Sequence, residues 1–224
     1  MPQVGDVDLA RRAFGWIASV AVDADGGLGW PENGVLSDDL YSGTAGVLLG
    51  CAEAAAAGLG PADVSAGARG RLLHLARQGP GVAALPDDGV FSGWAGVAVA
   101  LRAWSDATGD AAAAEAAAQV TQQIAGRITQ ASPDPLRYTD VISGDAGILL
   151  VLVADDSDTS LGAARVLADR LAEVAEPFPE GFHWRMAANR EYIMPGFSHG
   201  TAGAAYALAA AGRALHRRDL VDVA

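Results

Sequence analysis

Apolar and polar positions along the chain divide it into two kinds of helical segment that alternate. Segments of the first kind are apolar on nearly all sides, which is typical of a helix buried within a larger assembly. They span residues 47–57, 97–104, 148–154 and 204–215. Segments of the second kind carry apolar residues at helical spacing on one side and polar residues on the other. They span residues 9–22, 64–78, 111–128 and 161–174. Because β-branched residues are scattered and strict alternation never persists, the pattern predicts an all-α protein of outer and inner helices.

A glycine-containing motif precedes each apolar segment. Its four copies are Ser42-Gly43-Thr44-Ala45-Gly46, Ser92-Gly93-Trp94-Ala95-Gly96, Ser143-Gly144-Asp145-Ala146-Gly147 and His199-Gly200-Thr201-Ala202-Gly203. Their last glycines lie 50, 51 and 56 residues apart, which indicates a repeat of one outer and one inner helix. A ring of such pairs, an α/α-toroid, is the simplest arrangement that buries every inner helix, although an open solenoid satisfies the same repeat. We therefore expect residues 1–224 to form a single toroid domain.

The motif has a local structural explanation. Ser42, Ser92 and Ser143 are suited to cap the free N–H groups that begin an inner helix. The glycines lack a Cβ atom, so neighbouring turns can approach closely. This explanation suffices for the first two copies of the motif.

The net negative charge of the chain disfavours some classes of binding partner. The chain has 27 acidic and 15 basic residues, a formal net charge of -12, so it should repel nucleic acid and anionic membrane surfaces. We expect no membrane span, because no apolar run is long enough to cross a bilayer. The N-terminus does not resemble a signal peptide, and the only cysteine, Cys51, cannot form an internal disulfide. These features predict a cytoplasmic protein, and its arginine-only, alanine-rich composition is typical of high-GC bacteria.

The third and fourth motifs carry candidate chemistry. Asp140, in Tyr138-Thr139-Asp140-Val141-Ile142, precedes the third inner helix, and His199 replaces serine in the fourth motif. Both side chains would lie at the same end of the ring. A carboxylate beside an imidazole suits general acid–base chemistry. The structural alternatives are a solvated loop aspartate and a capping or core histidine.

These residues resemble the lanthionine synthetase C-like (LanC-like) cyclases. The resemblance rests on Tyr138-Thr139-Asp140-Val141-Ile142-Ser143-Gly144 and on Met194-Pro195-Gly196-Phe197-Ser198-His199-Gly200-Thr201-Ala202-Gly203. It implies a toroid of about seven helix pairs around a zinc ion, of which this chain would form about four. It also implies that a cysteine thiolate of a precursor peptide adds to dehydroalanine or dehydrobutyrine, which gives a lanthionine thioether. Asp140 and His199 match the acid–base residues that help to deprotonate the thiol and protonate the enolate.

The chain departs from the family in its metal ligands. The resemblance implies two cysteines and a histidine in later repeats, and Cys51 alone cannot replace them, so we expect no metal ligand and no bound zinc on this chain. The chain would then be an N-terminal portion, incomplete at its C-terminus and inactive alone. Its implied partner is a dehydrated precursor peptide, with a lanthipeptide dehydratase or a complementing chain as further candidates. The alternative function is a metal-free peptide-binding or scaffold protein that pairs with another chain.

Other polar residues have simpler explanations. We expect His74 to pack within a helix, His183 to lie in a packed loop and His216 to be exposed. The acidic pairs Asp38-Asp39 and Asp87-Asp88 could suggest a glycosidase or a magnesium-dependent cyclase, but solvated turn residues account for them better. The absence of lysine excludes a P-loop.

Overall fold

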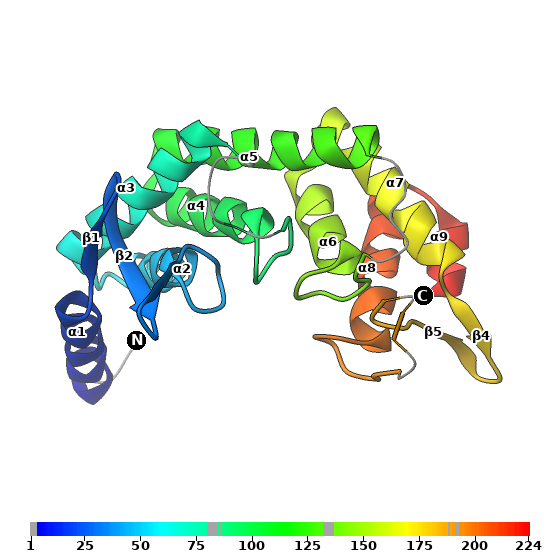
Figure 1. Ribbon diagram of the computed structural model, residues 1–224, viewed down its shortest axis with the longest axis horizontal. Helices are drawn as coiled ribbons and strands as arrows, with labels where there is room; N and C mark the ends of the chain where they lie inside the picture. Colours follow the sequence, from blue (N-terminus) through cyan, green and yellow to red (C-terminus); the bar gives the residue numbers. More distant parts are fainter. Residues whose placement is uncertain (1–3, 80–84, 86, 132–136, 188, 191–192) are drawn as a thin grey trace. The chain divides into compact units, whose positions relative to one another are not determined.

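The computed structural model describes residues 4–79, 85, 87–131, 137–187, 189–190 and 193–224 (Figure 1). The chain divides into two compact units, which are described separately. Unit 1 comprises Met1–Leu85 and Gly96–Val120, and unit 2 comprises Pro86–Ala95 and Thr121–Ala224. Helices α4 (Trp94–Thr108) and α5 (Ala111–Gln130) contribute residues to both units.

Unit 1 combines helices with a small antiparallel sheet. Its remaining elements are α1 (Val4–Ser19), β1 (Val22–Ala24), β2 (Gly27–Glu32), β3 (Val35–Ser37), α2 (Thr44–Ala56) and α3 (Ala62–Gln78). The sheet has the order β1-β2-β3, and β2 packs on α3. The inner helix α2 packs against the outer helix α3, with Leu48, Leu72 and Leu75 buried. The apolar pattern therefore predicted both of these helices correctly.

The sheet in unit 1 was not predicted. The first outer helix was expected to continue to Val22, but it ends at Ser19, and Val22 begins β1. Asn33 and Gly34 connect β2 to β3 with φ values of 51° and 79°. Asparagine followed by glycine is a strong hairpin signal because both residues tolerate positive φ. The strands are too short for alternation of polar and apolar residues to reveal them.

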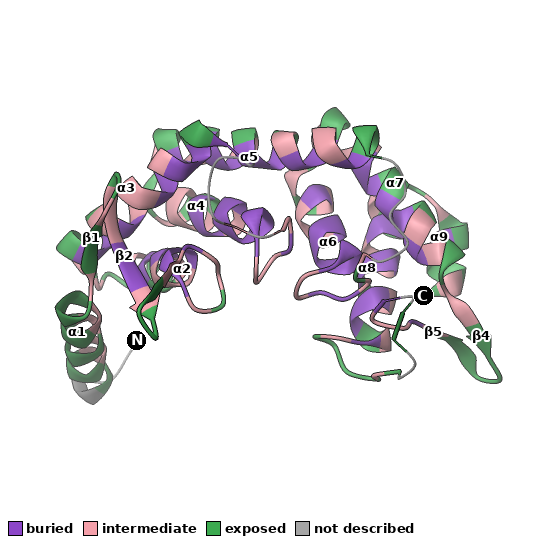
Figure 2. Ribbon diagram, viewed as in Figure 1, coloured by how far each residue is buried: buried purple, intermediate pink, exposed green. Residues whose placement is uncertain are grey.

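Unit 2 is built around the inner helix α6 (Asp145–Asp155), which packs against both α7 and α8. Its other elements are α7 (Asp158–Glu173), β4 (Glu176–Phe178), β5 (Gly181–His183), α8 (Thr201–Ala214) and α9 (Arg218–Val223). Ile148, Leu149 and Leu152 of α6 are buried. Much of the α6 ribbon in Figure 2 is purple, the colour of buried residues. Strands β4 and β5 form a hairpin where a packed loop around His183 was expected.

The segment before each inner helix folds back along the first turn of that helix. We call these segments the mouth loops; they span residues 37–43, 87–93, 138–144 and 194–200. The N–H groups of Trp94, Asp145 and Thr201 each donate to the carbonyl seven residues earlier, at 3.1, 2.9 and 2.8 Å. Main-chain carbonyls thus satisfy N–H groups at the helix starts. Inner helices consequently begin at the third residue of the motif, three residues earlier than predicted.

The motif glycines permit this folding back. A Cβ atom on Gly144 would lie 2.5 Å from the Tyr138 carbonyl oxygen, and one on Gly147 would collide with the Val141 carbonyl. The close approach that the motif predicted is confirmed. The prediction that serines cap the helices was wrong for α2 and α6, because the N-cap residues are Gly43 and Gly144, without a side-chain cap.

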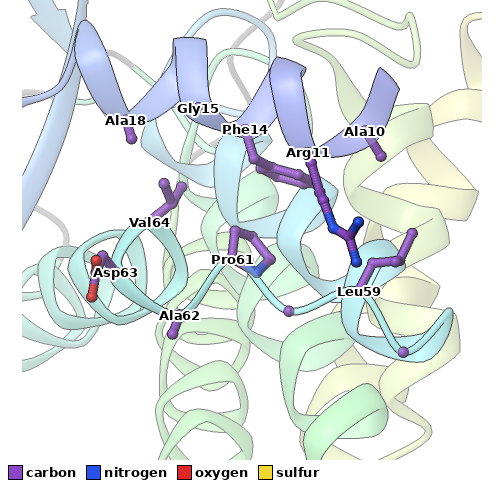
Figure 3. A pocket seen from close by; sticks show the side chains of 12 residues that line it. Ala10, Arg11, Phe14, Gly15, Ala18, Leu59, Pro61, Ala62, Asp63 and Val64 are labelled. Carbon is purple, nitrogen blue, oxygen red and sulfur yellow. The ribbon is translucent and has the colours of Figure 1, made fainter. Parts of the chain in front are cut away.

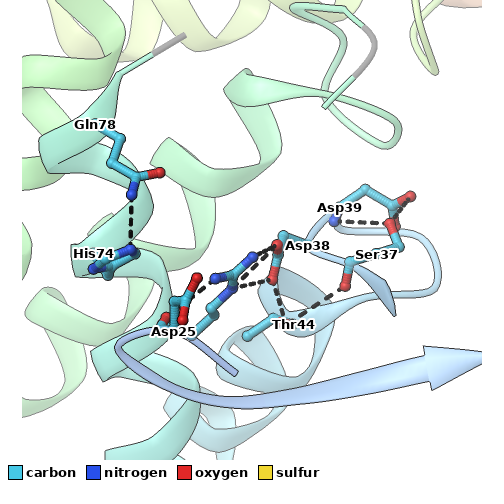
Figure 4. Close-up of polar contacts among 8 residues, drawn as sticks. Asp25, Ser37, Asp38, Asp39, Thr44, His74 and Gln78 are labelled. Atoms are coloured by element: carbon cyan, nitrogen blue, oxygen red, sulfur yellow. Dashed lines mark hydrogen bonds and ion pairs between the residues drawn. The ribbon is translucent and has the colours of Figure 1, made fainter. Parts of the chain in front are cut away.

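Arginines on the outer helices hold acidic residues near the mouth loops. Arg71 of α3 binds Asp38 through Nε and Nη2, with Nη2 2.7 Å from Oδ2 (Figure 4). The Asp38 carboxylate also accepts a hydrogen bond from Thr44 Oγ1 at 2.8 Å. In unit 2, Arg127 of α5 binds Asp88 in the same way. The expectation of solvated turn residues was therefore wrong for Asp38 and Asp88.

Candidate acid–base site

Asp140 and His199 lie in hydrogen-bonding contact within unit 2. His199 Nδ1 is 2.7 Å from Asp140 Oδ2, and the N–H of Ser143 donates to Asp140 Oδ1 at 2.9 Å. The Asp140 side chain is 2% exposed and that of His199 is 42% exposed. Asp140 is thus buried, unlike a solvated loop aspartate, and the N-cap of α8 is Gly200 without a side-chain cap. The structure brings the two predicted site residues together.

Backbone contacts between successive mouth loops position this pair. The N–H of Val141 donates to the Ser198 carbonyl at 3.1 Å, so the residues next to Asp140 and His199 are joined directly. Thr139, the residue before Asp140, makes two further contacts. Its N–H donates to the Met186 carbonyl at 2.8 Å, and its hydroxyl donates to the Arg185 carbonyl at 2.7 Å. The segment around Asp140 is therefore held by main-chain contacts at neighbouring residues.

The Asp140 contact determines which nitrogen of His199 is available. A carboxylate only accepts hydrogen bonds, so the proton of a neutral imidazole lies on Nδ1, toward Asp140. Nε2 then carries the lone pair, and the ring is exposed enough for a ligand to reach it. This arrangement can accept a proton at Nε2 and release it again, while Asp140 orients the ring.

A second carboxylate lies close to the pair in the chain. Asp145, the first residue of α6, is bound by Arg137 and Arg170, with contacts of 2.6 and 3.2 Å. The Asp145 side chain is 3% exposed. Arg170 belongs to α7, so this ion pair joins the inner helix α6 to the outer helix α7. Sequence reasoning treated Asp145 as a variable motif position, although a charge at the start of an apolar helix was a usable signal.

The described residues do not fit a zinc site. Burial raises the pKa of the Cys51 thiol to about 11, and this residue is 0% exposed in α2 of unit 1, so its thiol stays protonated at neutral pH. His199 is already bound to Asp140. Within the described part of the chain, no group of three or more His, Cys, Asp or Glu residues could hold a metal ion.

The remaining histidines lie apart from this chemistry. His74 is hydrogen-bonded to Gln78 at 2.8 Å on α3 (Figure 4), as expected for a residue packed on its helix. His183 lies 3.2 Å from Glu176, which joins the two strands of the hairpin. His216 is exposed, as predicted.

A pocket of about 390 Å³ lies in unit 1, between α1 and the segment that joins α2 to α3 (Figure 3). Phe14, Leu59, Pro61 and Val64 form much of its apolar wall, and Arg11 lies at its edge. None of the glycine motifs contributes to its lining. The pocket is therefore separate in sequence from the Asp140–His199 pair.

Among the helices of the described residues, none is long and apolar enough to span a membrane.

Comparisons with known proteins agree with the motif assignment. The sequence model of the family "Lanthionine synthetase C-like protein" matches residues 34–224. Among solved structures, a nisin cyclase matches with a TM-score of 0.65 and 17% identity, over 84% of this chain and 56% of that chain. The chain thus spans little more than half of that cyclase. The likeness shows the fold, an α/α-toroid of the LanC-like type. No curated protein matches the chain.

Proposed function

The chain belongs to the lanthionine synthetase C-like family, and we propose that it forms part of a cytoplasmic lanthipeptide cyclase. Its substrate would be a precursor peptide that already contains dehydroalanine or dehydrobutyrine. The cysteine sulfur of the peptide adds to the β-carbon of the dehydro residue and forms the thioether bond. The observation that supports this proposal is the 2.7 Å contact between His199 and Asp140 at neighbouring mouth loops.

The pair can supply both proton transfers of such an addition. Nε2 of His199 accepts the thiol proton, and the thiolate attacks the β-carbon. The electron pair of the C=C bond moves to the adjacent carbonyl as an enolate, and the protonated imidazole returns a proton to the α-carbon. The reaction is an addition with no redox change, and Asp140 keeps the ring oriented throughout.

Zinc, which the family resemblance implies, would need ligands from outside the described residues, because these do not fit a metal site. A zinc-bound sulfur is held as thiolate near neutral pH. The purified chain of 224 residues should therefore bind less than one equivalent of zinc and should not cyclise peptides alone.

The test measures ring formation by the polypeptide or complex that contains residues 1–224. The substrate is a synthetic peptide with one dehydrobutyrine and one cysteine. Cyclisation leaves the peptide mass unchanged but removes its free thiol, so alkylation with N-ethylmaleimide before mass spectrometry counts the rings. We expect His199→Ala and Asp140→Ala each to lower the rate by at least about 100-fold without changing zinc content.

A matched control is His216→Ala, because His216 is an exposed histidine outside the motifs. Its rate should equal that of the unaltered protein. Ring formation at the normal rate by either site variant would refute the proposed role of the pair.

The alternative is a metal-free peptide-binding or scaffold protein that pairs with another chain. The absence of a three-ligand cluster among the described residues favours it. Under this alternative, the peptide binds but remains uncyclised even when zinc and a complementing chain are supplied.

A further inference from the structure

A chain of hydrogen bonds in unit 2 joins the mouth loop of α4 to that of α6. Ser92 Oγ lies 3.0 Å from both carboxylate oxygens of Asp87 and 2.9 Å from Ser143 Oγ. Ser143 belongs to the same mouth loop as Asp140, and its N–H binds the Asp140 carboxylate. The proposed mechanism uses neither Asp87, Ser92 nor the Ser143 hydroxyl.

The backbone holds these three side chains in place. The N–H of Phe91 donates to the Ile142 carbonyl at 2.9 Å, which fixes the two loops beside each other. The N–H of Gly89 donates to Asp87 Oδ1 at 2.7 Å and orients the carboxylate. A Cβ atom on Gly89 would lie 2.6 Å from Ser143 Cα, so this approach requires a glycine.

The carboxylate determines the direction of the hydrogen bonds. Ser92 has one hydroxyl proton, and a carboxylate is a stronger acceptor than a neutral hydroxyl, so Ser92 donates to Asp87. The Ser143 hydroxyl must then donate its own proton to Ser92 Oγ. Ser143 Oγ therefore presents only lone pairs to any further partner.

Within the described part of the chain, Ser92 Oγ at 2.9 Å is the hydrogen-bond partner of Ser143 Oγ, and no other group donates to that oxygen. Ser143 is partly exposed. It lies three residues after Asp140 and directly before Gly144, the N-cap of α6. The Ser143 N–H and His199 Nδ1 contact the two oxygens of the same Asp140 carboxylate, so a ligand at His199 has Ser143 as a neighbouring residue.

We propose that Ser143 Oγ accepts a hydrogen bond from a backbone N–H of the peptide that reacts beside Asp140 and His199. Asp87 and Ser92 are positioning residues that keep the serine an acceptor. A backbone N–H suits this oxygen because every peptide offers such donors, whereas a thiol is a weak donor. This inference rests on the proposed function and names how the same site orients its substrate.

The test uses the full chain and a fluorescein-labelled peptide that contains one dehydrobutyrine, with its cysteine replaced by serine so that it cannot react. Fluorescence anisotropy gives the dissociation constant. A set of peptides replaces each backbone N–H in turn by an ester oxygen. One peptide of this set should bind the unaltered chain about fivefold more weakly than the all-amide peptide does. A fivefold change is about the effect of losing one neutral hydrogen bond.

The Ser143→Ala variant should bind the amide peptide about fivefold more weakly than the unaltered chain does. It should bind that ester peptide and the amide peptide equally. Ser143→Thr, which keeps the hydroxyl, should restore the difference between them. Ser92→Ala should weaken binding by about two- to threefold, because the Ser143 hydroxyl can then rotate. Ser42→Ala is the matched control, since Ser42 holds the same motif position in unit 1, and it should bind like the unaltered chain.

The outcomes separate this inference from the proposed function. If the unaltered chain binds the peptide but Ser143→Ala still discriminates between ester and amide, the inference is wrong and the proposed function stands. An unaltered chain that binds no peptide would overturn both. Circular dichroism of each variant verifies that a loss of binding does not come from unfolding.

Discussion

The Asp110 carboxylate combines three stabilising interactions within unit 1, and its removal should be costly. Oδ1 accepts hydrogen bonds from the N–H groups of Ala112 and Ala113 at 3.1 and 3.3 Å, which caps the start of α5. Oδ2 accepts from the Trp104 indole at 3.1 Å. Arg69 of α3 binds both oxygens and joins the two helices. We predict that Asp110→Ala destabilises the protein more than Asp110→Asn, by about the contribution of the helix cap.

The size of the effect follows from these contacts. Loss of a helix cap costs about 1 kcal/mol, and an indole N–H left without its partner costs about 1 kcal/mol more. The Arg69 pair adds up to about 1 kcal/mol, because the Arg69 side chain is 34% exposed and solvent screens the pair. Asp110→Ala should therefore lower the free energy of unfolding by about 3 kcal/mol. Asparagine keeps the cap through its one oxygen, but its NH2 group cannot accept from the Trp104 indole or from Arg69, so Asp110→Asn should cost about 2 kcal/mol.

The contribution of the Asp110 charge to the free energy of unfolding decreases at low pH. The hydrogen bonds from Arg69 lower the pKa of Asp110 from 3.8 to about 2, aided by the Ala113 and Trp104 contacts. A folded-state pKa below the unfolded value means that the stabilisation is complete above pH 3.8 and is lost as the pH falls toward 2. The difference in unfolding free energy between the unaltered protein and Asp110→Asn should stay constant from pH 7 to about 5 and should shrink at lower pH.

Urea unfolding at several pH values, followed by tryptophan fluorescence and circular dichroism, measures these differences. Asp23→Asn is the control, since Asp23 is exposed on β1, and it should change the unfolding free energy by less than about 0.5 kcal/mol. A loss below about 1 kcal/mol for Asp110→Ala would refute the reasoning. So would an Asp110→Asn difference that is as large at pH 2.5 as at pH 7.

Two further predictions concern Asp145 and Cys51. Asp145→Asn leaves Arg137 and Arg170 without their buried counter-charge and should lower the urea unfolding free energy by about 3 kcal/mol; a change below about 1 kcal/mol would contradict this. Burial raises the pKa of Cys51 to about 11, so N-ethylmaleimide at pH 7.5 should label the native chain far more slowly than the chain unfolded in guanidinium. Equal labelling rates would show that Cys51 is accessible.

The helices could be predicted because each inner helix is apolar on all sides and each outer helix on one. The starts of the inner helices were misplaced by three residues. Thr44 and Asp145 begin helices but are polar, so the apolar runs start later than the helices do. The signal for the true start was the glycine motif itself, because Gly43 and Gly144 are the N-cap residues.

The proximity of Asp140 and His199 could be predicted because both residues lie in sequence motifs, whereas their polar surroundings could not. Ser92 and Ser143 are 51 residues apart, and Arg170 is 25 residues from Asp145. Such contacts depend on how far one helix is shifted along the next, and apolar periodicity does not specify that shift. The Asn33-Gly34 hairpin, in contrast, was readable from sequence and was overlooked.

The contacts between mouth loops explain why an acid meets a histidine in this part of the chain. Gly89 lies three residues before the serine of its motif and packs against Ser143, the first residue of the next motif. Asp140 lies three residues before Ser143 and contacts His199, again the first residue of the next motif. The same geometric relation thus occurs twice within unit 2, once with a glycine and once with a carboxylate. Where this position is Gly89, the two loops approach too closely for a side chain. Where it is Asp140, the carboxylate contacts the imidazole of His199. The repeat therefore supplies the geometry, and two changes within it, Asp140 and His199, place a carboxylate beside an imidazole.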